Sequence, residues 1–407
     1  MLAELPVVVL EGAKGVGKTA TALQRAGSVY SLDRRTMREM AWADPSVVLE
    51  GSPPVFIDEW QLVPDVWNEV RHAVDADMSA GRFILAGSAT PKKGTRVHSG
   101  AGRMVRLAMR PMSLPERGIE KPAISMSHLM DGGRDVAGQT SVKLSDYVDE
   151  ILSSGFPGIR AVKPAARQRL VESYISQVAE HDIDELGVEV RRPDTLLHWL
   201  AAYGAATSTT ASYSSLLAAA TPGEASKPAK ETGMAYRDLL ARLWLLDPLP
   251  AWVPGFAHLK RLGQAPKHHL VDPALAAALV GATRETLLHG EGPTISSDGT
   301  FLGALFESLA AQTVRVLAGA AGAKVSHLRT QGGEREIDMI VERKDGKVLA
   351  VEVKLATVVR PADVKSLNWL EEQLPDTVVG KLILNTGQLA YRRPDGVAVV
   401  PLAMLGP

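Results

Sequence analysis

The chain has 407 residues, of which 45% are hydrophobic and 22% charged, and its formal net charge is −1. This length predicts two or three domains, and the composition excludes a disordered or fibrous protein. A net charge near zero excludes a protein that coats nucleic acid over its whole surface, and the lack of cysteine excludes disulfides, thiolate metal sites and a cysteine nucleophile.

The N-terminal sequence MLAELPVVVLEG does not have the basic-then-apolar pattern of a secretion signal. The sequence also contains no uninterrupted run of about eighteen apolar residues. We therefore expect a cytoplasmic protein with no membrane association.

The first predicted strand, Pro6–Leu10, leads into a glycine-rich loop and then into a helix over Thr19–Ala26. The loop has the pattern G-x-x-x-x-G-K-T, in which main-chain N–H groups, the helix N-terminus and the lysine surround a phosphate. A glycine-rich surface turn is the alternative interpretation. The pattern predicts an ATP site formed by Gly12, Gly15, Val16, Gly17, Lys18, Thr19 and Ala20, with Lys18 also catalytic and the Thr19 hydroxyl a ligand of Mg²⁺.

A second predicted strand begins at Pro54 and ends in two carboxylates, Asp58 and Glu59. Together with the phosphate loop, this pattern predicts that Asp58 holds Mg²⁺ and that Glu59 polarises the water that attacks the γ-phosphate. Alone, the same pair is typical of a helix N-cap with a solvated neighbour. A third strand, Arg82–Ala86, leads to Ser88, which we predict to sense the γ-phosphate.

The segment Pro91–Arg117 is strongly basic. It has a single glutamate, Glu116, against seven basic residues: Lys92, Lys93, Arg96, Arg103, Arg106, Arg110 and Arg117. Three roles are open for it: an arginine finger for a neighbouring subunit's nucleotide, contact with nucleic acid, or a solvated loop.

These segments resemble the bacterial AAA-type ATPases whose C-terminal half is a conserved domain of unknown function. The resemblance is carried by the phosphate loop, PPVFIDEWQLVPDVWNEVR, RFILAGSAT and SGAGRMVRLAMRPMSLPE, and it extends over nearly the whole chain. It implies that the Asp-Glu-x-Gln run is the Walker B element, that Arg103 is the candidate catalytic finger and that the protein forms an AAA-like homo-oligomer.

The middle of the chain reads as helical. Helices over about Ser145–Leu186 would form a lid or linker, and three more are predicted at Asp194–Gly204, Tyr213–Ala220 and about Glu231–Leu246. These three predict a winged-helix-like module.

Basic residues between 227 and 267 predict a modest positive face in this region, where Lys230, Arg237 and Arg242 could contact DNA. The alternative is a protein-packing element with a core of Leu239, Leu240, Leu243 and Leu246. The ten histidines, His268 and His269 among them, show no metal-binding spacing, and we expect them at the surface or at helix ends.

The C-terminal region is predicted to contain a helix over about Phe301–Ala318, which carries Glu307, and two strands, Arg335–Arg343 and Lys347–Leu355. Asp338 followed by Glu352-Val353-Lys354 resembles the PD-(D/E)xK nuclease core. A three-residue loop with Gly346 in the left-handed conformation would pair Asp338 with Glu352 and put Lys354 on the same face. A two-residue loop would put the two carboxylates on opposite faces.

In the first register, two carboxylates about 5 Å apart would need a cation between them. We therefore predict Asp338 and Glu352 as metal ligands, and Asp338, Glu352 and Lys354 as catalytic residues of a nuclease-like site. Glu307 would complete the metal site from its helix; the alternative is that it pairs with a nearby basic residue. A degenerate nuclease-like binding fold and an ordinary charged sheet edge are the alternatives.

The predicted fold is α/β: a P-loop NTPase parallel sheet over residues 1–120, a helical lid or linker over 121–190, a winged-helix-like module over 191–265 and an α+β PD-(D/E)xK nuclease-like domain over 266–407. The leading hypothesis is an ATPase, dependent on ATP and Mg²⁺, that couples hydrolysis to a nuclease-like domain acting on DNA or RNA. The alternative is a nucleotide-controlled switch that binds a protein partner through an inactive nuclease-like fold.

Overall fold

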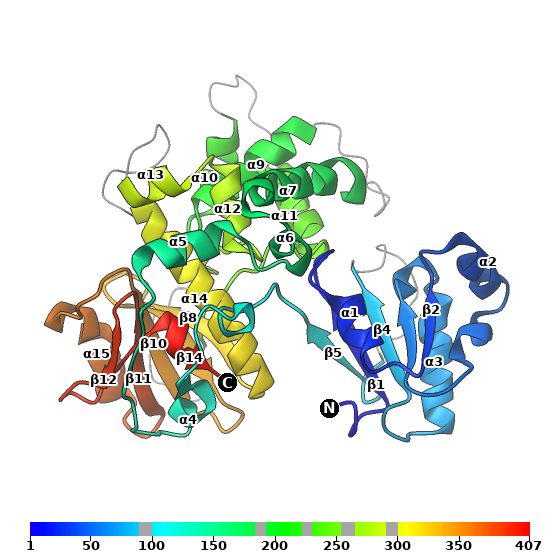
Figure 1. Cartoon of the computed structure of the whole chain (residues 1–407), viewed down its shortest axis with the longest axis horizontal. Helices are drawn as coiled ribbons and strands as arrows, with labels where there is room; N and C mark the ends of the chain where they lie inside the picture. Colours follow the sequence, from blue (N-terminus) through cyan, green and yellow to red (C-terminus); the bar gives the residue numbers. More distant parts are fainter. Residues whose placement is uncertain (89–99, 184–192, 222–229, 254–264, 290–299) are drawn as a thin grey trace. The chain divides into compact units, whose positions relative to one another are not determined.

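A computed structural model describes residues 1–88, 100–183, 193–221, 230–253, 265–289 and 300–407 (Figure 1). The chain divides into two units. The first consists of Met1–Arg110, Gln177–Arg191 and Asp238–Leu245, and the second of Pro111–Ser176, Arg192–Arg237 and Leu246–Pro407. The predicted basic residues Lys92, Lys93 and Arg96 lie outside the described residues.

The first unit is built on a five-stranded parallel sheet with the order β2-β3-β4-β1-β5. Its strands are β1 (Val7–Glu11), β2 (Ser28–Ser31), β3 (Val55–Asp58), β4 (Phe83–Gly87) and β5 (Met104–Ala108). Glu11 lies beside Gly87, and Asp58 beside Ala86. The carboxyl ends of β1, β3 and β4 therefore meet at one edge, where parallel α/β sheets bind their ligands.

Alternation along β1 explains how helices cover both faces of this sheet. Val7 and Val9 join a core with Trp67 of α3 (Asp65–Ala76), which also includes Ala41 of α2 (Arg35–Ala43) and Val48 of the 3₁₀ helix η1 (Pro45–Leu49). Val8 and Leu10 pack on the other side with Ala22 of α1 (Lys18–Leu23). Both faces are buried, which is why the strands read as continuous apolar runs.

The second unit contains a seven-stranded mixed sheet with the order β7-β12-β13-β11-β10-β9-β8. Its strands are β7 (Gly138–Gln139), β8 (Lys324–Arg329), β9 (Glu336–Glu342), β10 (Val348–Lys354), β11 (Val378–Asn385), β12 (Leu389–Arg392) and β13 (Ala398–Pro401). β14 (Leu405–Gly406) pairs separately with β6 (Ile124–Ser125). Figure 1 shows β10 and β11 between helices α14 (Thr300–Ala320) and α15 (Lys365–Gln373).

Helices make up the rest of the second unit. They include α4 (Met126–Met130), α5 (Leu144–Leu152), α6 (Pro157–Arg160), α7 (Pro164–Gln177), α9 (Pro193–Ala205), α10 (Tyr213–Ala220), α12 (Pro273–Leu279) and α13 (Arg284–His289), while α11 (Lys230–Arg242) continues into the first unit. Helices α9, α10 and α11 confirm the three predicted helices. Leu246 and Leu249 then form antiparallel bridges with Leu270 and Lys267. The winged-helix assignment stays a prediction.

Helix α14 is long and apolar enough to cross a membrane, the one such helix among the residues that the structure describes. Two thirds of it, 67%, is buried within the fold. Leu305, Leu309 and Val314 are fully covered. This degree of burial is typical of a core helix in a globular domain.

Three predictions about surface side chains are wrong. The Arg117 side chain is fully buried, and its guanidinium donates to Met112 O, Glu150 O and Gln312 Oε1 within the second unit. Lys267, His268 and His269 are also buried, at 1%, 1% and 3% exposure, rather than lying on a basic face or at the surface. Burial of these polar groups depends on long-range contacts that local sequence patterns do not contain.

Candidate functional site

The glycine-rich loop after β1 has the backbone conformation that its glycines allow. Gly12, Gly15 and Gly17 have φ values of 155°, 81° and 99°. A Cβ atom on Gly12 would lie 2.3 Å from the main-chain oxygen of Met109, so no larger residue fits there. The loop ends at Gly17, which precedes the first residue of α1. Val16 is buried and Ala20 exposed.

Lys18 points back into this loop. Its ammonium donates to the main-chain oxygens of Gly12 at 2.7 Å and Ala13 at 2.9 Å. Burial lowers the pKa of Lys18, while the negative charges of Glu59 and Asp58 oppose that shift. The positive charge is therefore fixed inside the loop, where a phosphate would lie.

Thr19 and Asp58 form the next part of the site. The Thr19 hydroxyl donates to Asp58 Oδ2 at 2.8 Å, across 39 residues of sequence. Burial raises the pKa of Asp58, and the hydrogen bond from Thr19 partly offsets this. Both predicted magnesium ligands thus present oxygen atoms at one point beside the loop, which is the donor chemistry that Mg²⁺ prefers.

Glu59 follows Asp58 in a left-handed backbone conformation, with φ 52° and ψ 42°. Its carboxylate accepts a hydrogen bond from the Ser88 hydroxyl at 2.8 Å and another from the Gln61 amide. Ser88 is the predicted sensor at the end of β4. Gln61 was not predicted as a site residue, although its place in the Asp-Glu-x-Gln run was a usable signal.

The structure places the predicted finger, Arg103, on the surface of the first unit. Its guanidinium pairs with Asp75 of α3, and the hydrogen bond between them lowers the pKa of Asp75. Arg106 pairs with Glu11 at 3.1 Å and lies over the Trp67 ring. Both arginines thus have partners within the first unit, and the finger role stays a prediction.

The residues at this sheet edge fit a magnesium–nucleotide complex. The loop is a cradle that a side chain at Gly12 would fill, and Lys18 supplies a buried positive charge. Thr19 and Asp58 supply neighbouring oxygens, and a second carboxylate, Glu59, is held beside them. This is the set of groups that phosphoryl transfer requires.

A second cluster of charged residues lies in the C-terminal sheet. Arg343 N donates to Lys347 O, Gly346 has φ 79°, and β9 pairs with β10 in the predicted register up to Met339 and Val351. The three-residue loop is therefore confirmed. The Asp338 carboxylate accepts from Val353 N at 2.9 Å and lies beside Glu352, which accepts from Lys354 at 2.9 Å.

Lys267 occupies the middle of this cluster, where no sequence pattern predicted it. Its ammonium lies 2.9 Å from Glu307, 2.9 Å from Glu336 and 2.9 Å from Asp338. The sequence signal was weak: Lys267 is separated from the apolar pair Leu270 and Val271 by two histidines, and nothing connects it to Asp338, 71 residues away.

The charges in the cluster shift one another's protonation. Burial alone would lower the pKa of Lys267, but the three carboxylates raise it well above its ordinary value. Burial raises the pKa of Glu307 to about 8, assisted by the charge of Asp338. Burial also raises the pKa of Glu352 well above normal, whereas Lys267 and Lys354 outweigh burial at Asp338 and lower its pKa.

The cluster does not fit a divalent metal as it stands. Glu307 and Asp338 were predicted as metal ligands, but both contact the ammonium of Lys267. Among the residues that the structure describes, no group of three or more histidine or acidic side chains is arranged to hold a metal ion. The structure thus brings the predicted residues together around a lysine.

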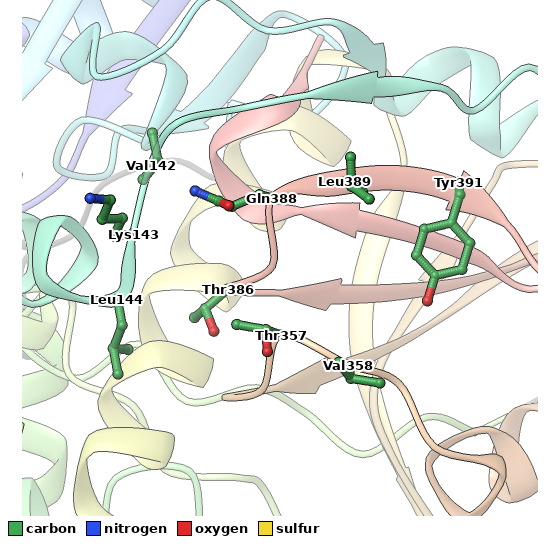
Figure 2. Close-up of a pocket in the computed structure, with 9 residues that line it drawn as sticks. All are labelled: Val142, Lys143, Leu144, Thr357, Val358, Thr386, Gln388, Leu389 and Tyr391. Carbon is green, nitrogen blue, oxygen red and sulfur yellow. The ribbon is translucent and has the colours of Figure 1, made fainter.

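A pocket of about 660 Å³ lies beside the carboxyl ends of β10 and β11 (Figure 2). It is lined by Val142, Lys143, Leu144, Thr357, Val358, Thr386, Gln388, Leu389 and Tyr391. Val358 and Leu389 are exposed. None of the predicted site residues is among the side chains that line it.

Comparison with known families agrees with the N-terminal geometry. Residues 4–117 match the family described as AAA domain, residues 144–286 match a domain of unknown function, DUF8612, and residues 302–405 match another, DUF4143. The N-terminal part of the chain is therefore an AAA-type P-loop domain of the ATPase class.

Two curated proteins are similar over most of the chain. They are uncharacterized protein Mb2031c of Mycobacterium bovis and uncharacterized protein Rv2008c of Mycobacterium tuberculosis, each 26% identical over 97% of this chain and 80% of the relative. Among solved structures, the Walker-type ATPase paby2304 of Pyrococcus abyssi matches with 14% identity and a TM-score of 0.39, over 68% of this chain and 91% of that one.

Proposed function

We propose that the first unit hydrolyses ATP with the help of Mg²⁺. The observation that carries this proposal is the meeting of Lys18, the Thr19–Asp58 pair and the Ser88-bound Glu59 at one edge of a parallel sheet. These groups come from three separate strand ends. An ordinary glycine-rich surface turn would not bring these groups together.

Each residue has a role that follows from its position. The N–H groups of the loop and the Lys18 ammonium bind and orient the phosphates, and Thr19 and Asp58 would hold Mg²⁺, which neutralises phosphate charge when bound. Glu59 orients the attacking water and accepts its proton. Ser88 and Gln61 hold the Glu59 carboxylate in place.

The test is ATP binding and hydrolysis by Lys18→Ala. We expect nucleotide binding to weaken by about 100-fold or more and hydrolysis to fall with it, because the loop loses its buried charge. Arg25→Ala is the matched control, since Arg25 is an exposed cation just beyond α1 whose guanidinium donates to Thr21 O within the same segment. ATP hydrolysis by Lys18→Ala at the wild-type rate would contradict the proposal.

For the second unit, we propose the inactive nuclease-like alternative over active nuclease chemistry. The contact of Lys267 with Asp338 supports it, because the same oxygen would have to bind a catalytic metal. Incubation with labelled DNA and RNA, ATP and Mg²⁺ tests this choice. Cleavage that Glu352→Ala abolishes would favour coupling to nucleic acid; absence of cleavage, with capture of a protein partner, favours the switch.

Oligomerisation belongs to the same proposal. In an AAA-like homo-oligomer, Arg103 would leave Asp75 and reach the nucleotide of a neighbouring subunit. Arg103→Ala should then lower the ATPase rate only at protein concentrations that permit assembly.

A further inference from the structure

We propose that Lys267 is the resident cation of the C-terminal carboxylate cluster: its ammonium takes the place of a divalent metal, and removal of that ammonium would expose a metal site. This inference goes beyond ATP hydrolysis and does not depend on it. It concerns Glu307, Glu336, Asp338 and Glu352, which come from α14, β9 and β10.

The position of Lys267 is fixed by its own backbone. Lys267 N donates to Leu249 O at 2.9 Å, and Leu249 N donates to Lys267 O at 2.8 Å, so the two residues form one antiparallel bridge. The side chain is 1% exposed. Lys267 therefore cannot swing out to solvent without the loss of buried contacts.

The ammonium is fully satisfied where it lies. It has three N–H donors, and three carboxylates lie within 2.9 Å of its nitrogen: Glu307, Glu336 and Asp338. A divalent ion would bind the same oxygens at about 2.0–2.6 Å. The ammonium and the metal therefore exclude each other from this position.

Two further oxygens of the cluster accept hydrogen bonds from other groups. Asp338 Oδ2 accepts from Val353 N, and Glu352 Oε2 accepts from Lys354. The cluster contains four carboxylates, with the ammonium groups of Lys267 and Lys354 among them and Arg329 3.8 Å from Glu336. Without Lys267, the oxygens of Glu307, Glu336 and Asp338 that contact its ammonium would lose that cation, and a divalent ion would be able to take its place because carboxylate oxygens are its preferred ligands.

The experiment measures Mn²⁺ binding to the full chain without nucleotide, by electron paramagnetic resonance. All proteins carry Asp58→Asn, so that the N-terminal site lacks the carboxylate that is proposed to hold its metal. We expect no Asp338-dependent Mn²⁺ binding by this parent at about 1 mM metal, and one new site in Lys267→Met that binds at least about tenfold more tightly. Adding Asp338→Asn to Lys267→Met should abolish the gain.

Lys381→Met is the matched control, because Lys381 is also a buried lysine of this sheet, paired with Glu371 outside the cluster. It should gain no Mn²⁺ site. Asp338-dependent Mn²⁺ binding by the parent would overturn the proposal, and so would the absence of a new site in folded Lys267→Met. If Lys267→Met does not fold, titration of the parent with Mn²⁺ decides. Mn²⁺ binding that is lost on Asp338→Asn contradicts the proposal, and the absence of such binding up to about 10 mM Mn²⁺ supports it.

Discussion

Glu59 has a backbone conformation that few glutamates adopt. A left-handed φ of 52° costs a residue with a side chain about 1–2 kcal/mol. The conformation turns the carboxylate toward Ser88 and Gln61, both of which donate hydrogen bonds to it. Such local strain is typical of functional sites, where the surrounding structure compensates for it.

Ser88→Ala tests whether Ser88 positions this carboxylate. A hydrogen bond to a charged group contributes about 1.5–3 kcal/mol, so its loss should slow hydrolysis by about 10- to 100-fold. Binding of ATP should change little, because the Ser88 hydroxyl contacts Glu59 rather than the loop. Steady-state kinetics and calorimetric titration separate the two effects. Ser88→Thr keeps the hydroxyl and should recover most of the rate; an undiminished rate in Ser88→Ala would contradict the assignment.

Site residues that belong to a local motif could be predicted from the sequence, whereas those brought together by long-range folding could not. Lys18 and Thr19 belong to one short motif whose spacing fixes their geometry, and Asp58 ends a buried strand. Lys267 reaches Asp338 only because the chain folds back over 71 residues. No local periodicity encodes that contact, so it could not be predicted.

At the scale of elements, the hairpin of β9 and β10 was predictable in register because its turn leaves little choice. Arg343 O accepts from Gly346 N at 3.0 Å, and Gly346 takes the left-handed conformation after Asp345. With that loop length, every pair along the two strands follows. The position of the hairpin between β8 and β11 depends on long-range pairing and was not predicted.

Gly346→Ala tests the turn. A Cβ atom at Gly346 would meet nothing within 4 Å, so any cost arises from its φ of 79° alone. We expect the free energy of unfolding to fall by about 1–2 kcal/mol, as measured by urea titration.

Gly303→Ala is the matched control for this change. Gly303 lies in α14 with equally open space around it and no positive φ. Alanine should stabilise the helix there by about 0.5–1 kcal/mol. Equal effects at the two glycines would show that the turn conformation does not set the stability of the hairpin.

At the scale of the whole molecule, the division of the chain was the hardest feature to predict. The first domain was predicted to extend to residue 120, whereas the first segment of the first unit ends at Arg110 and the unit also includes Gln177–Arg191 and Asp238–Leu245. Arg117 appeared to continue a basic run, yet it packs beside Gln312 of α14. Unit boundaries depend on which segments meet in space, and composition carries little of that information.

Folding of the second unit also buries His269 in its neutral form. Burial lowers the pKa of this histidine to about 3, and the charges of Lys267, Arg315 and His268 act in the same direction against Asp247. Between about pH 3 and 6.5 the unfolded chain therefore binds a proton that the folded chain does not. The stability that neutral His269 allows is complete above pH 6.5 and is lost as the pH falls below that value.

His269→Leu removes this proton uptake and loses no hydrogen bond from the ring nitrogens, which have none in the described structure. We compare the free energy of unfolding of the variant with that of wild type at each pH. Between pH 7.5 and pH 5.0 this difference should shift by about 2 kcal/mol in favour of the variant. Urea titrations at both pH values measure this change, and His198→Leu, on an exposed position of α9, controls for loss of a histidine. The raised pKa values of Glu307 and Glu352 make the folded protein more stable as the pH falls. This effect is the same in wild type and in both variants, so it cancels in the comparison. If the wild-type and His269→Leu stabilities ran parallel between the two pH values, His269 would have to be charged in the folded molecule.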